Sequence, residues 1–410
     1  MSSEWNRIKV RDLGRIVTGK TPSTSRKDFF GGLVPFLTPT DMPDGQKHVG
    51  TERTLTDAGL ATVKNCLISK GVAVSCIGWK MGKSVLIKER TVTNQQINTV
   101  VVDESRFDLP FVYYLLSSMR PQIFELGATP TRTPIVNKST FGNIDIAVPA
   151  LPLQQEISRL GTALDDRITL LRETNATLEA IAQALFKSWF VDFDPVRAKL
   201  EGRPPEGMDE ATASLFPDGF EKSELGLVPR GWRIGIFDEV ALLKGGKQLE
   251  RTNFANSGAN PVFGGAGEMG RTDLSNADGF VITVGRVGAY CGQFFWHLGS
   301  AWVNNNASHI KPRTANQSIW IFQWLKCVNM ELIKKGAAQP FVSNGDIAAL
   351  KIALPPDGVV SRFVEIAEPI FRERYRIQEQ AQTLATLRDT LLPRLISGQL
   401  RLPKVAKALS

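Results

Sequence analysis

The sequence predicts an α+β protein in which two related β-rich globular domains are separated by two long helices. Two stretches, one in the middle of the chain and one at its end, carry apolar residues at helical spacing, and an internal repeat places a strand-rich segment before each of them. With 410 residues, 42% of them hydrophobic and 22% charged, the chain has the length and composition of a folded protein of two or three domains.

The first domain is expected over residues 1–150. Short β-branched runs at residues 71–77 and 99–102, bounded by Gly and Asn turns, are typical of strands, whereas residues 111–116 favour a helix. An alternating run at residues 144–148, followed by prolines, is expected to be the last strand of this domain.

The first long helix is expected over residues 151–193. Its apolar residues recur in steps of three, four or seven and so line one helix face: Leu153, Ile157, Leu160, Leu164, Ile168, Leu171, Leu178, Ile181, Leu185 and Trp189. Roughly 35 to 40 residues at about 1.5 Å each make a rod of about 50 to 60 Å, longer than an ordinary globular helix needs. Such a rod cannot bury its apolar face alone, so we interpret it as a spacer that requires a helical partner.

A connector rich in Pro, Gly and charge is expected over residues 194–231, followed by the second domain over residues 232–355. Within that domain, residues 280–284 and 293–296 favour strands and residues 319–334 favour a helix. Like the first domain, it ends with an alternating run followed by prolines.

The second long helix, expected over residues 356–402, is the candidate partner of the first. Its apolar residues repeat every seven positions, at Phe363, Ile370, Ile377, Leu384 and Leu391. Pro369 is expected to kink a helix that begins before it, and Pro393 is expected to end it. Periodicity alone leaves open the alternative of two unrelated surface helices, each packed on its own core.

An internal repeat supports the pairing. Trp5 aligns with Trp232, Gly19 with Gly245, and Asn94 with Asn304, always in the same order. The offset between the copies shrinks along the chain, as expected if loops are shorter in the second copy.

Basic and acidic residues are unevenly distributed along the chain. The net charge is +8 overall, and residues 1–150 carry 19 basic and 13 acidic side chains, whereas residues 151–231 carry 9 and 14. The basic surplus suits a polyanionic partner for the domains. Four scattered cysteines and three scattered histidines suggest neither disulfides nor a zinc site, and no run approaches a membrane span, so a cytoplasmic protein is expected.

Two glycine motifs point to enzymes but lack the expected context. Residues 14–21 match the phosphate-loop pattern, which would assign Lys20 and Thr21 to nucleotide binding, but no helical pattern follows them. Residues 265–270 match the dinucleotide-binding pattern and are also followed by a turn-like segment. A non-catalytic binding protein is therefore favoured over a phosphate-loop nucleotide-binding enzyme. A scaffold that binds anionic surfaces without sequence preference is a further alternative.

Polar, basic and aromatic residues at equivalent loop positions of both copies are the candidate contacts to nucleic acid. Arg and Lys suit guanine edges and phosphates, Asn and Gln suit adenine, and an aromatic ring can stack or wedge. The candidates are Thr18, Lys20, Thr21, Ser23, Trp79, Lys80, Lys83, Asn94, Gln95, Thr131, Arg132 and Lys138 in the first copy, and Lys244, Lys247, Gln248, Arg286, Asn304, Asn305, Gln339, Phe341 and Asn344 in the second.

The layout resembles the specificity (S) subunit of type I restriction-modification systems over about residues 5–402. The resemblance is carried by the two Trp openings, by IDIAVPALPLQQEI at residues 144–157, by ALFKSWFVDF at residues 184–193 and by LLPRLISGQL at residues 391–400. The second junction, LPPDGVV at residues 354–360, departs from the family's pattern because it lacks the Gln-Gln-Glu-Ile segment.

This resemblance implies two target recognition domains that each read one half of an asymmetric, bipartite site in double-stranded DNA. It implies that the helices form an antiparallel coiled coil on which two modification (methyltransferase) subunits dock, joined by restriction subunits. Cofactors are expected only on those partners, namely S-adenosylmethionine, ATP and magnesium, and no membrane association is implied.

Overall fold

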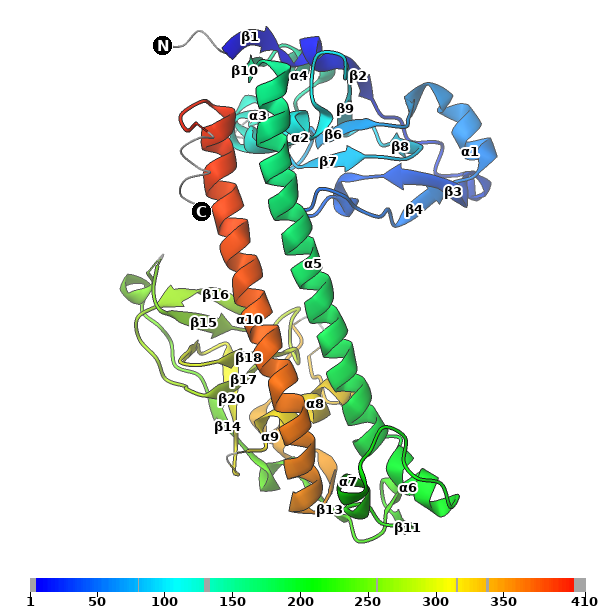
Figure 1. Cartoon of the computed structure of the whole chain (residues 1–410), viewed down its shortest axis with the longest axis vertical. Coiled ribbons are helices and arrows are strands. Elements are labelled where there is room, and N and C mark those ends of the chain that lie inside the picture. Colours follow the sequence, from blue (N-terminus) through cyan, green and yellow to red (C-terminus); the bar gives the residue numbers. More distant parts are fainter. Residues whose placement is uncertain are drawn as a thin grey trace. The chain divides into compact units, whose positions relative to one another are not determined.

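The computed structural model describes residues 5–79, 81–128, 133–255, 257–314, 316–336 and 339–401. The chain divides into two compact units, one formed by Met1–Leu170 with Ala381–Ser410 and the other by Leu171–Gln380. Each unit is α+β and contains part of both long helices (Figure 1). The predicted fold class, two sheet-rich domains with two long helices, is confirmed.

The first unit contains the strands of the first domain and four short helices. The strands are β1 (Trp5–Lys9), β2 (Gly14–Thr18), β3 (Phe30–Leu37), β4 (Arg53–Leu55), β5 (Leu67–Ile68), β6 (Gly71–Ser75), β7 (Ser84–Ile87), β8 (Thr91–Thr93), β9 (Ile97–Val102) and β10 (Asp145–Pro149). The helices are α1 (Asp57–Thr62), α2 (Leu109–Ser118), α3 (Arg120–Gly127) and α4 (Lys138–Gly142).

These strands form two four-stranded sheets, in the orders β2-β9-β6-β7 and β4-β3-β8-β5, and a ribbon of β1 with β10. Strand β6, with the sequence Gly-Val-Ala-Val-Ser, is buried on both faces, as suits a strand without charged side chains. Val72 and Val74 pack with Phe111 of α2, whereas the intervening Ala73 packs on the other face with Leu37 of β3. The alternation therefore places the sheet between a helical layer and the second sheet.

The second unit repeats this plan after the connector. Its strands are β11 (Phe220–Ser223), β12 (Gly226–Pro229), β13 (Arg233–Ile236), β14 (Ala241–Gly245), β15 (Asn260–Gly264), β16 (Gly267–Thr272), β17 (Phe280–Gly285), β18 (Phe294–Leu298), β19 (Trp302–Val303), β20 (Ala307–Pro312) and β21 (Lys351–Leu354). Its short helices are α6 (Asp194–Leu200), α7 (Glu210–Ser214), α8 (Ser318–Cys327) and α9 (Asn344–Ala348).

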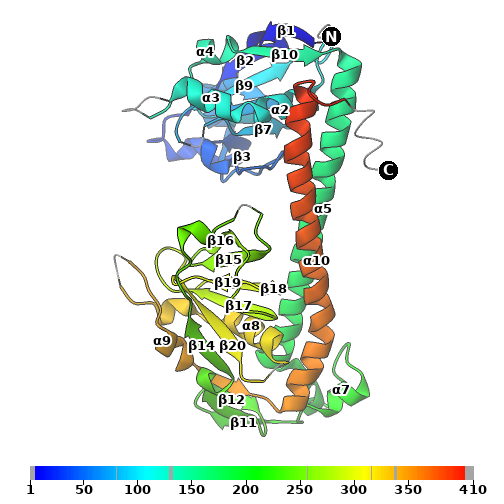
Figure 2. The same ribbon diagram turned by 90° about the vertical axis from the view of Figure 1, so that its left-hand side faces the viewer.

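The sheet orders show that the repeat is structural. The sheet β14-β20-β17-β18 corresponds to β2-β9-β6-β7, the sheet β16-β15-β19 to β4-β3-β8, and the ribbon β13-β21 to β1-β10 (Figure 2). Even the parallel pair in the second sheet recurs, as β3 with β8 and as β15 with β19. The connector is itself ordered, because it contains α6, α7 and the β11-β12 hairpin.

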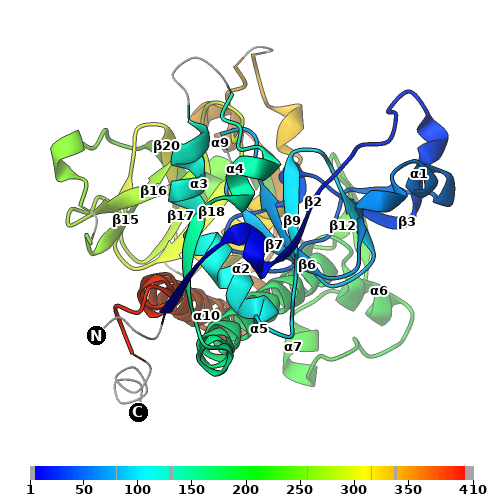
Figure 3. The same cartoon turned by 90° about the horizontal axis from the view of Figure 1, so that it is seen from above.

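Helices α5 (Leu151–Phe190) and α10 (Asp357–Ile396) are each 40 residues long. They lie side by side when viewed along their length (Figure 3). In the second unit, Phe363 of α10 packs against the rings of Phe186, Trp189 and Phe190 of α5. In the first unit Gly161 lies against Leu392 and Asp165 pairs with Arg388, so the helices are antiparallel there. In the second unit Glu179 pairs with Arg374 and Phe186 packs against Phe363, which shows the same direction.

A polar pair with at least one buried partner joins α5 and α10 in each unit. In the first unit, Nη1 of Arg388 donates to Oδ1 of Asp165 at 2.7 Å, with both side chains about nine-tenths buried. The Tyr114 hydroxyl of α2 donates to the other oxygen of Asp165 at 2.5 Å, so the domain is joined to the same pair. In the second unit, the buried Arg374 donates to Glu179 at 2.7 Å. Because a slipped register would leave these groups unpaired in an apolar setting, the pairs select one alignment of the helices.

One expectation about α10 is wrong, namely that Pro393 ends the helix. The helix begins at Asp357 and continues through Pro369, and it also passes Pro393 before ending at Ile396. A proline removes its own N–H but keeps its carbonyl, and Ser397 N donates to the carbonyl of Pro393 at 3.0 Å. The expected helix at residues 319–334 is also shorter, because α8 ends at Cys327 and only a 3₁₀ turn at Met330–Leu332 follows.

Asp165→Asn is expected to lower the free energy of unfolding by about 3 kcal/mol, because the Arg388 guanidinium loses its buried counter-charge and keeps only the exposed Asp389. The neighbouring Asp166 is exposed, so Asp166→Asn is the matched control and should change stability by less than about 0.5 kcal/mol. Urea unfolding followed by circular dichroism measures both. Equal losses in the two variants would contradict a stabilising role for the buried pair.

Candidate nucleic-acid interface

Four loops of each domain meet at one end of its main sheet. In the first domain, β2 and β6 end at this edge while β9 and β7 begin there, because neighbouring strands of the sheet are antiparallel. The segment before α4 joins them, since Val136 N donates to the carbonyl of Cys76 just beyond β6 at 2.8 Å. The second domain has the same arrangement, in which Val342 N donates to the carbonyl of Arg286 at 3.0 Å.

Backbone hydrogen bonds define which loop positions are equivalent. Lys20 N donates to the carbonyl of Thr93 at 2.9 Å, and Lys247 N donates to that of Val303 at 3.0 Å, so the two lysines correspond. Gly19 therefore corresponds to Gly246, and the alignment with Gly245 was one residue out. Gly246 is required there, because a β-carbon on it would lie 2.1 Å from the carbonyl oxygen of Asn304.

In the loop after β6, the equivalent residues of the two domains differ more from those that the sequence pattern suggests. Cys76 N donates to the carbonyl of Gln96 at 2.7 Å, and Arg286 N donates to that of Asn306 at 3.1 Å. Arg286 therefore corresponds to Cys76 and not to Trp79 and the lysines after it, with which the sequence pattern alone aligns Arg286 and its neighbours. The loop is ordered by hydrogen bonds that sequence letters do not reveal.

Most of the described candidate residues are exposed at this edge. They are Lys20, Ser23, Trp79, Gln95 and Lys138 in the first domain, and Lys244, Lys247, Gln248, Asn305, Gln339 and Phe341 in the second. Trp79 is 73% exposed and Phe341 42% exposed. Within the described ranges, no carboxylate lies within ion-pair distance of the four lysines among them. The edge therefore presents uncompensated positive charge beside amides and aromatic rings.

Some candidates are partly buried and bonded to neighbours. Thr18 Oγ1 donates to Oδ1 of Asn98 at 2.6 Å, and Thr21 Oγ1 donates to Oε1 of Gln95 at 2.5 Å. Asn94 Oδ1 accepts from Gln96 N at 3.0 Å. In the second domain, Asn344 Oδ1 accepts from Ser308 Oγ at 2.7 Å, and Arg286 is also partly buried.

Two candidates are buried, and their side chains form hydrogen bonds with backbone groups of neighbouring segments. Lys83 is 8% exposed, and its ammonium donates to the carbonyl of Met42 at 2.6 Å. Asn304 is 7% exposed, and its Oδ1 accepts from Leu249 N at 3.2 Å and from Asn305 N at 2.8 Å. Three further candidates, Lys80, Thr131 and Arg132, lie outside the described residues.

The structure adds an aromatic residue that the sequence comparison missed. Tyr290 is 51% exposed in the loop of residues 287–292, which follows β17. Gly78 N and Gly288 N donate to the carbonyls of Pro134 and Pro340, each at 2.9 Å, which aligns this loop with the one that carries Trp79. An alignment of the two copies that follows these hydrogen bonds makes Tyr290 a candidate contact as well.

The phosphate-loop pattern does not form a phosphate loop. Residues Gly14–Thr18 are strand β2, paired with β9, and the next helical element is a three-residue 3₁₀ turn at Lys27–Phe29. Residues 21–26, which directly follow Lys20, form no helix whose N-terminus could bind phosphate. The dinucleotide pattern at residues 265–270 lies in the β15-β16 hairpin, again without a helix after it.

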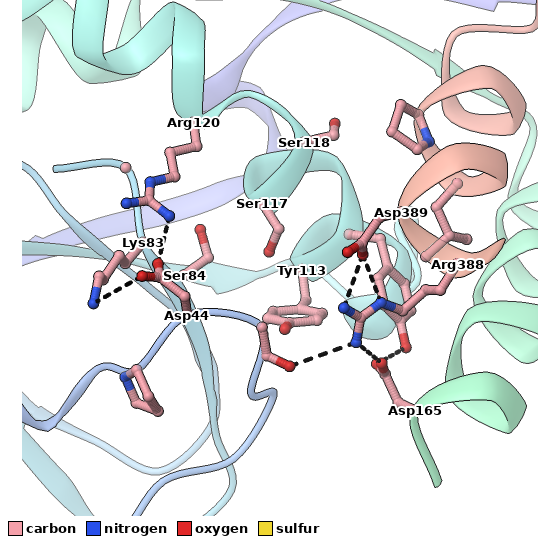
Figure 4. A pocket seen from close by; sticks show the side chains of 16 residues that line it. Asp44, Lys83, Ser84, Tyr113, Ser117, Ser118, Arg120, Asp165, Arg388 and Asp389 are labelled. Atoms are coloured by element: carbon pink, nitrogen blue, oxygen red, sulfur yellow. Dashed lines mark hydrogen bonds and ion pairs between the residues drawn. The ribbon is translucent and has the colours of Figure 1, made fainter. Parts of the chain in front are cut away.

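The first unit also contains a cavity of about 370 Å³ between the domain and its parts of the two long helices. Its charged groups are already paired: Asp44 with Lys83 and Arg120, and Asp165 with Arg388 (Figure 4). Burial beside Asp165 raises the pKa of the Tyr114 hydroxyl, which therefore stays protonated and donates. This arrangement holds the domain on the helices rather than activating a nucleophile.

Neither a metal site nor a membrane segment is found in the described ranges. No group of three or more His, Cys, Asp or Glu side chains there could hold a metal ion. No helix in that part of the chain has the length and apolar character needed to cross a bilayer.

Comparison with known proteins identifies the family. The model of the type I restriction modification DNA specificity domain matches residues 2–180 and 229–383, one match for each domain and its following helix. The chain belongs to this family. The structural repeat and the two helices are therefore features of a specificity subunit, as the sequence resemblance implied.

Relatives within the family span the whole chain. The specificity subunit of the type I restriction enzyme MjaIX from Methanocaldococcus jannaschii is 23% identical over 428 residues, covering 98% of this chain and 95% of the relative. That of the enzyme HindI from Haemophilus influenzae is 25% identical and covers 77% of this chain and 83% of the relative. The crystal structure of the type I S subunit from M. genitalium shares the fold, with a TM-score of 0.61 at 17% identity over 96% of this chain and 97% of that one.

Asn304→Ala is expected to lower the stability of the second domain by about 1 to 3 kcal/mol, because the N–H groups of Leu249 and Asn305 lose their acceptor. Asn305→Ala, at the exposed neighbouring position, should change it by less than about 0.5 kcal/mol. Thermal unfolding of both variants measures the difference. If Asn305→Ala were as destabilising as Asn304→Ala, Asn304 would have no special part in shaping the loop.

Proposed function

We propose that this chain is the sequence-specific DNA-recognition subunit of a type I restriction-modification complex. The supporting observation is that the same loop edge, with exposed lysines, amides and aromatic rings, occurs once in each of two domains of a chain from the DNA specificity family. Lysines without counter-ions suit phosphates, and exposed amides suit base edges. In this proposal each domain reads one half of a bipartite site in double-stranded DNA.

In this proposal, other subunits of the complex carry out the chemical reactions. Methylation of a base requires it to leave the duplex, and a recognition subunit holds the DNA while a partner performs that step. We propose that two modification subunits dock on the paired helices and that restriction subunits join them in the cytoplasm. S-adenosylmethionine, ATP and magnesium would then be bound by those partners, and this chain would be non-catalytic and without contact to membranes.

The candidate base contacts are the exposed residues of the loop edge. Gln95 and Asn305 occupy equivalent positions in the two domains, one residue after Asn94 and Asn304. Among the described residues the amide nitrogen of Gln95 makes no hydrogen bond, since the bond with Thr21 uses the amide oxygen. The buried Lys83 and Asn304 would act by holding the loops, not by touching bases.

Gln95→Ala and Asn305→Ala are expected to relax recognition in different halves of the DNA target, because they lie in different domains. Adenine-methylation mapping in cells that contain the chain and its modification subunit would first reveal the wild-type motif. Each variant should then lose discrimination at one position, by about ten-fold or more, if a good amide contact to a base is lost.

The outcomes separate the alternatives. Relaxation of the same half by both variants would contradict the assignment of one domain to one half. Equal affinity of the purified complex for cognate and random duplexes at matched salt would support the non-specific scaffold instead. Stabilisation of the isolated chain by ATP would favour the nucleotide-binding alternative.

We propose that the length of the helices determines how many bases between the two halves are left unread. Both α5 and α10 continue from one unit into the other, and the pairs Asp165 with Arg388 and Glu179 with Arg374 define their register in each unit. Seven helical residues span about 10 Å, and one base-pair step is about 3.4 Å.

Deleting residues 166–172 together with residues 381–387 should therefore keep both polar pairs and change the unread gap by up to about three base pairs. Methylation mapping of the double-deletion complex measures the gap. Removing either segment alone is the control, and it should prevent assembly because one polar pair is then out of register. An unchanged motif in the double deletion would contradict the proposed role of helix length.

A further inference from the structure

The two domains differ at the centre of their loop edges. Cys76 and Arg286 occupy the same position, since the backbone N–H and carbonyl of each make equivalent hydrogen bonds to the loop of residues 94–96 or 304–306 and to the segment before α4 or α9. The Cys76 side chain is 2% exposed, and burial raises the pKa of its thiol to about 11. At this position the first domain therefore has a neutral side chain that is buried and not accessible to a ligand.

The residues around this position differ in a matching way. In the first domain, Thr18 faces Asn98 across β2 and β9, and the two side chains are hydrogen-bonded at 2.6 Å. In the second domain, Gly245 faces Ser308 across β14 and β20, and Ser308 turns its hydroxyl to Asn344. Two larger side chains that bond to each other are thus replaced by a glycine and a serine that do not.

The small side chains at Gly245 and Ser308 leave space beside Arg286. A β-carbon added to Gly245 would lie 3.6 Å from Nη1 of Arg286, so even alanine would contact the guanidinium and a larger residue would crowd it. Small residues on both neighbouring strands therefore accompany the replacement of Cys76 by a long cationic side chain. Small residues on the neighbouring strands are expected if the Arg286 side chain extends over the end of the sheet.

In the described part of the chain, the Arg286 guanidinium has no hydrogen-bond or ion-pair partner. Among the described residues no carboxylate pairs with it, and its Nε is buried without an acceptor. Nη1 and Nη2 make no bond there and are not buried, so they are the donors open to a ligand. The backbone is held on both sides by the bonds to Asn306 and from Val342, which gives the side chain a fixed origin.

We propose that Arg286 reads a guanine, through O6 and N7 in the major groove, in the half-site recognised by the second domain. The proposal rests on the proposed function. A planar guanidinium donates two parallel hydrogen bonds to those acceptors, a contact that lysine cannot reproduce. The first domain cannot make this contact, because Cys76 stands in its place, so the two half-sites are read by different chemistry at this position.

Methylation mapping and duplex binding with the assembled complex test the proposal. Arg286→Lys keeps the charge but removes the planar fork, and Arg286→Gln removes both. Each is expected to reduce discrimination for guanine at one position of one half by about ten-fold to a hundred-fold, with the other half unchanged. Lys222→Gln, which removes one exposed charge from the β11-β12 hairpin of the same unit, is the control and should leave the motif intact.

A uniform loss of methylation or affinity with an unchanged motif would show that Arg286 contacts only phosphate, and would overturn the proposal. An unchanged motif at unchanged affinity would also overturn it. If the single variants fail to assemble, the triple variant Gly245→Thr, Arg286→Cys and Ser308→Asn rebuilds the neutral cluster of the first domain and should assemble with the same relaxed guanine position. The absence of any bipartite wild-type motif would instead count against the proposed function itself.

Discussion

An α-helix with an apolar stripe longer than a domain core must find another helix, and this constraint organises the chain. Helix α5 has 40 residues, more than either domain can cover, and α10 supplies a stripe of equal length. Each stripe is buried partly by the other helix and partly by a domain: Ile157 and Leu395 belong to the core of the first unit, and Phe186 and Phe363 to that of the second. The helices are therefore part of both hydrophobic cores.

Apolar packing alone does not select one alignment of two such helices. Leucine and isoleucine seams tolerate a shift by a heptad, whereas a buried charge does not, because a shift leaves it unpaired. The pairs of Arg388 with Asp165 and of Arg374 with Glu179 supply this selection, one in each unit. Tyr114 extends the first pair into the domain, so the same interaction orients the recognition domain on its helix.

The two domains show which parts of the repeat are structural and which are free to diverge. The strand order, the loop hydrogen bonds and the glycines at positions 19 and 246 recur, because each is imposed by backbone geometry. The exposed side chains of the loop edge differ, for example from Gln95 in one copy to Asn305 in the other. A scaffold that keeps its backbone while exchanging exposed side chains is suited to reading two different sequences.

The sequence by itself indicated the long helices, several strands, the duplication and the family resemblance, because each depends on local or ordered patterns: helical spacing in α5, the β-branched run at residues 71–77, and matched landmarks such as Trp5 and Trp232. Most of the described loop residues that it singled out are exposed. Tertiary structure alone decided the exact pairing of the copies, the burial of Lys83 and Asn304, and the passage of α10 through Pro369. These features depend on hydrogen bonds and packing between residues far apart in the chain, which no local pattern encodes. The contrast between Cys76 and Arg286 became visible only once those bonds had aligned the two domains.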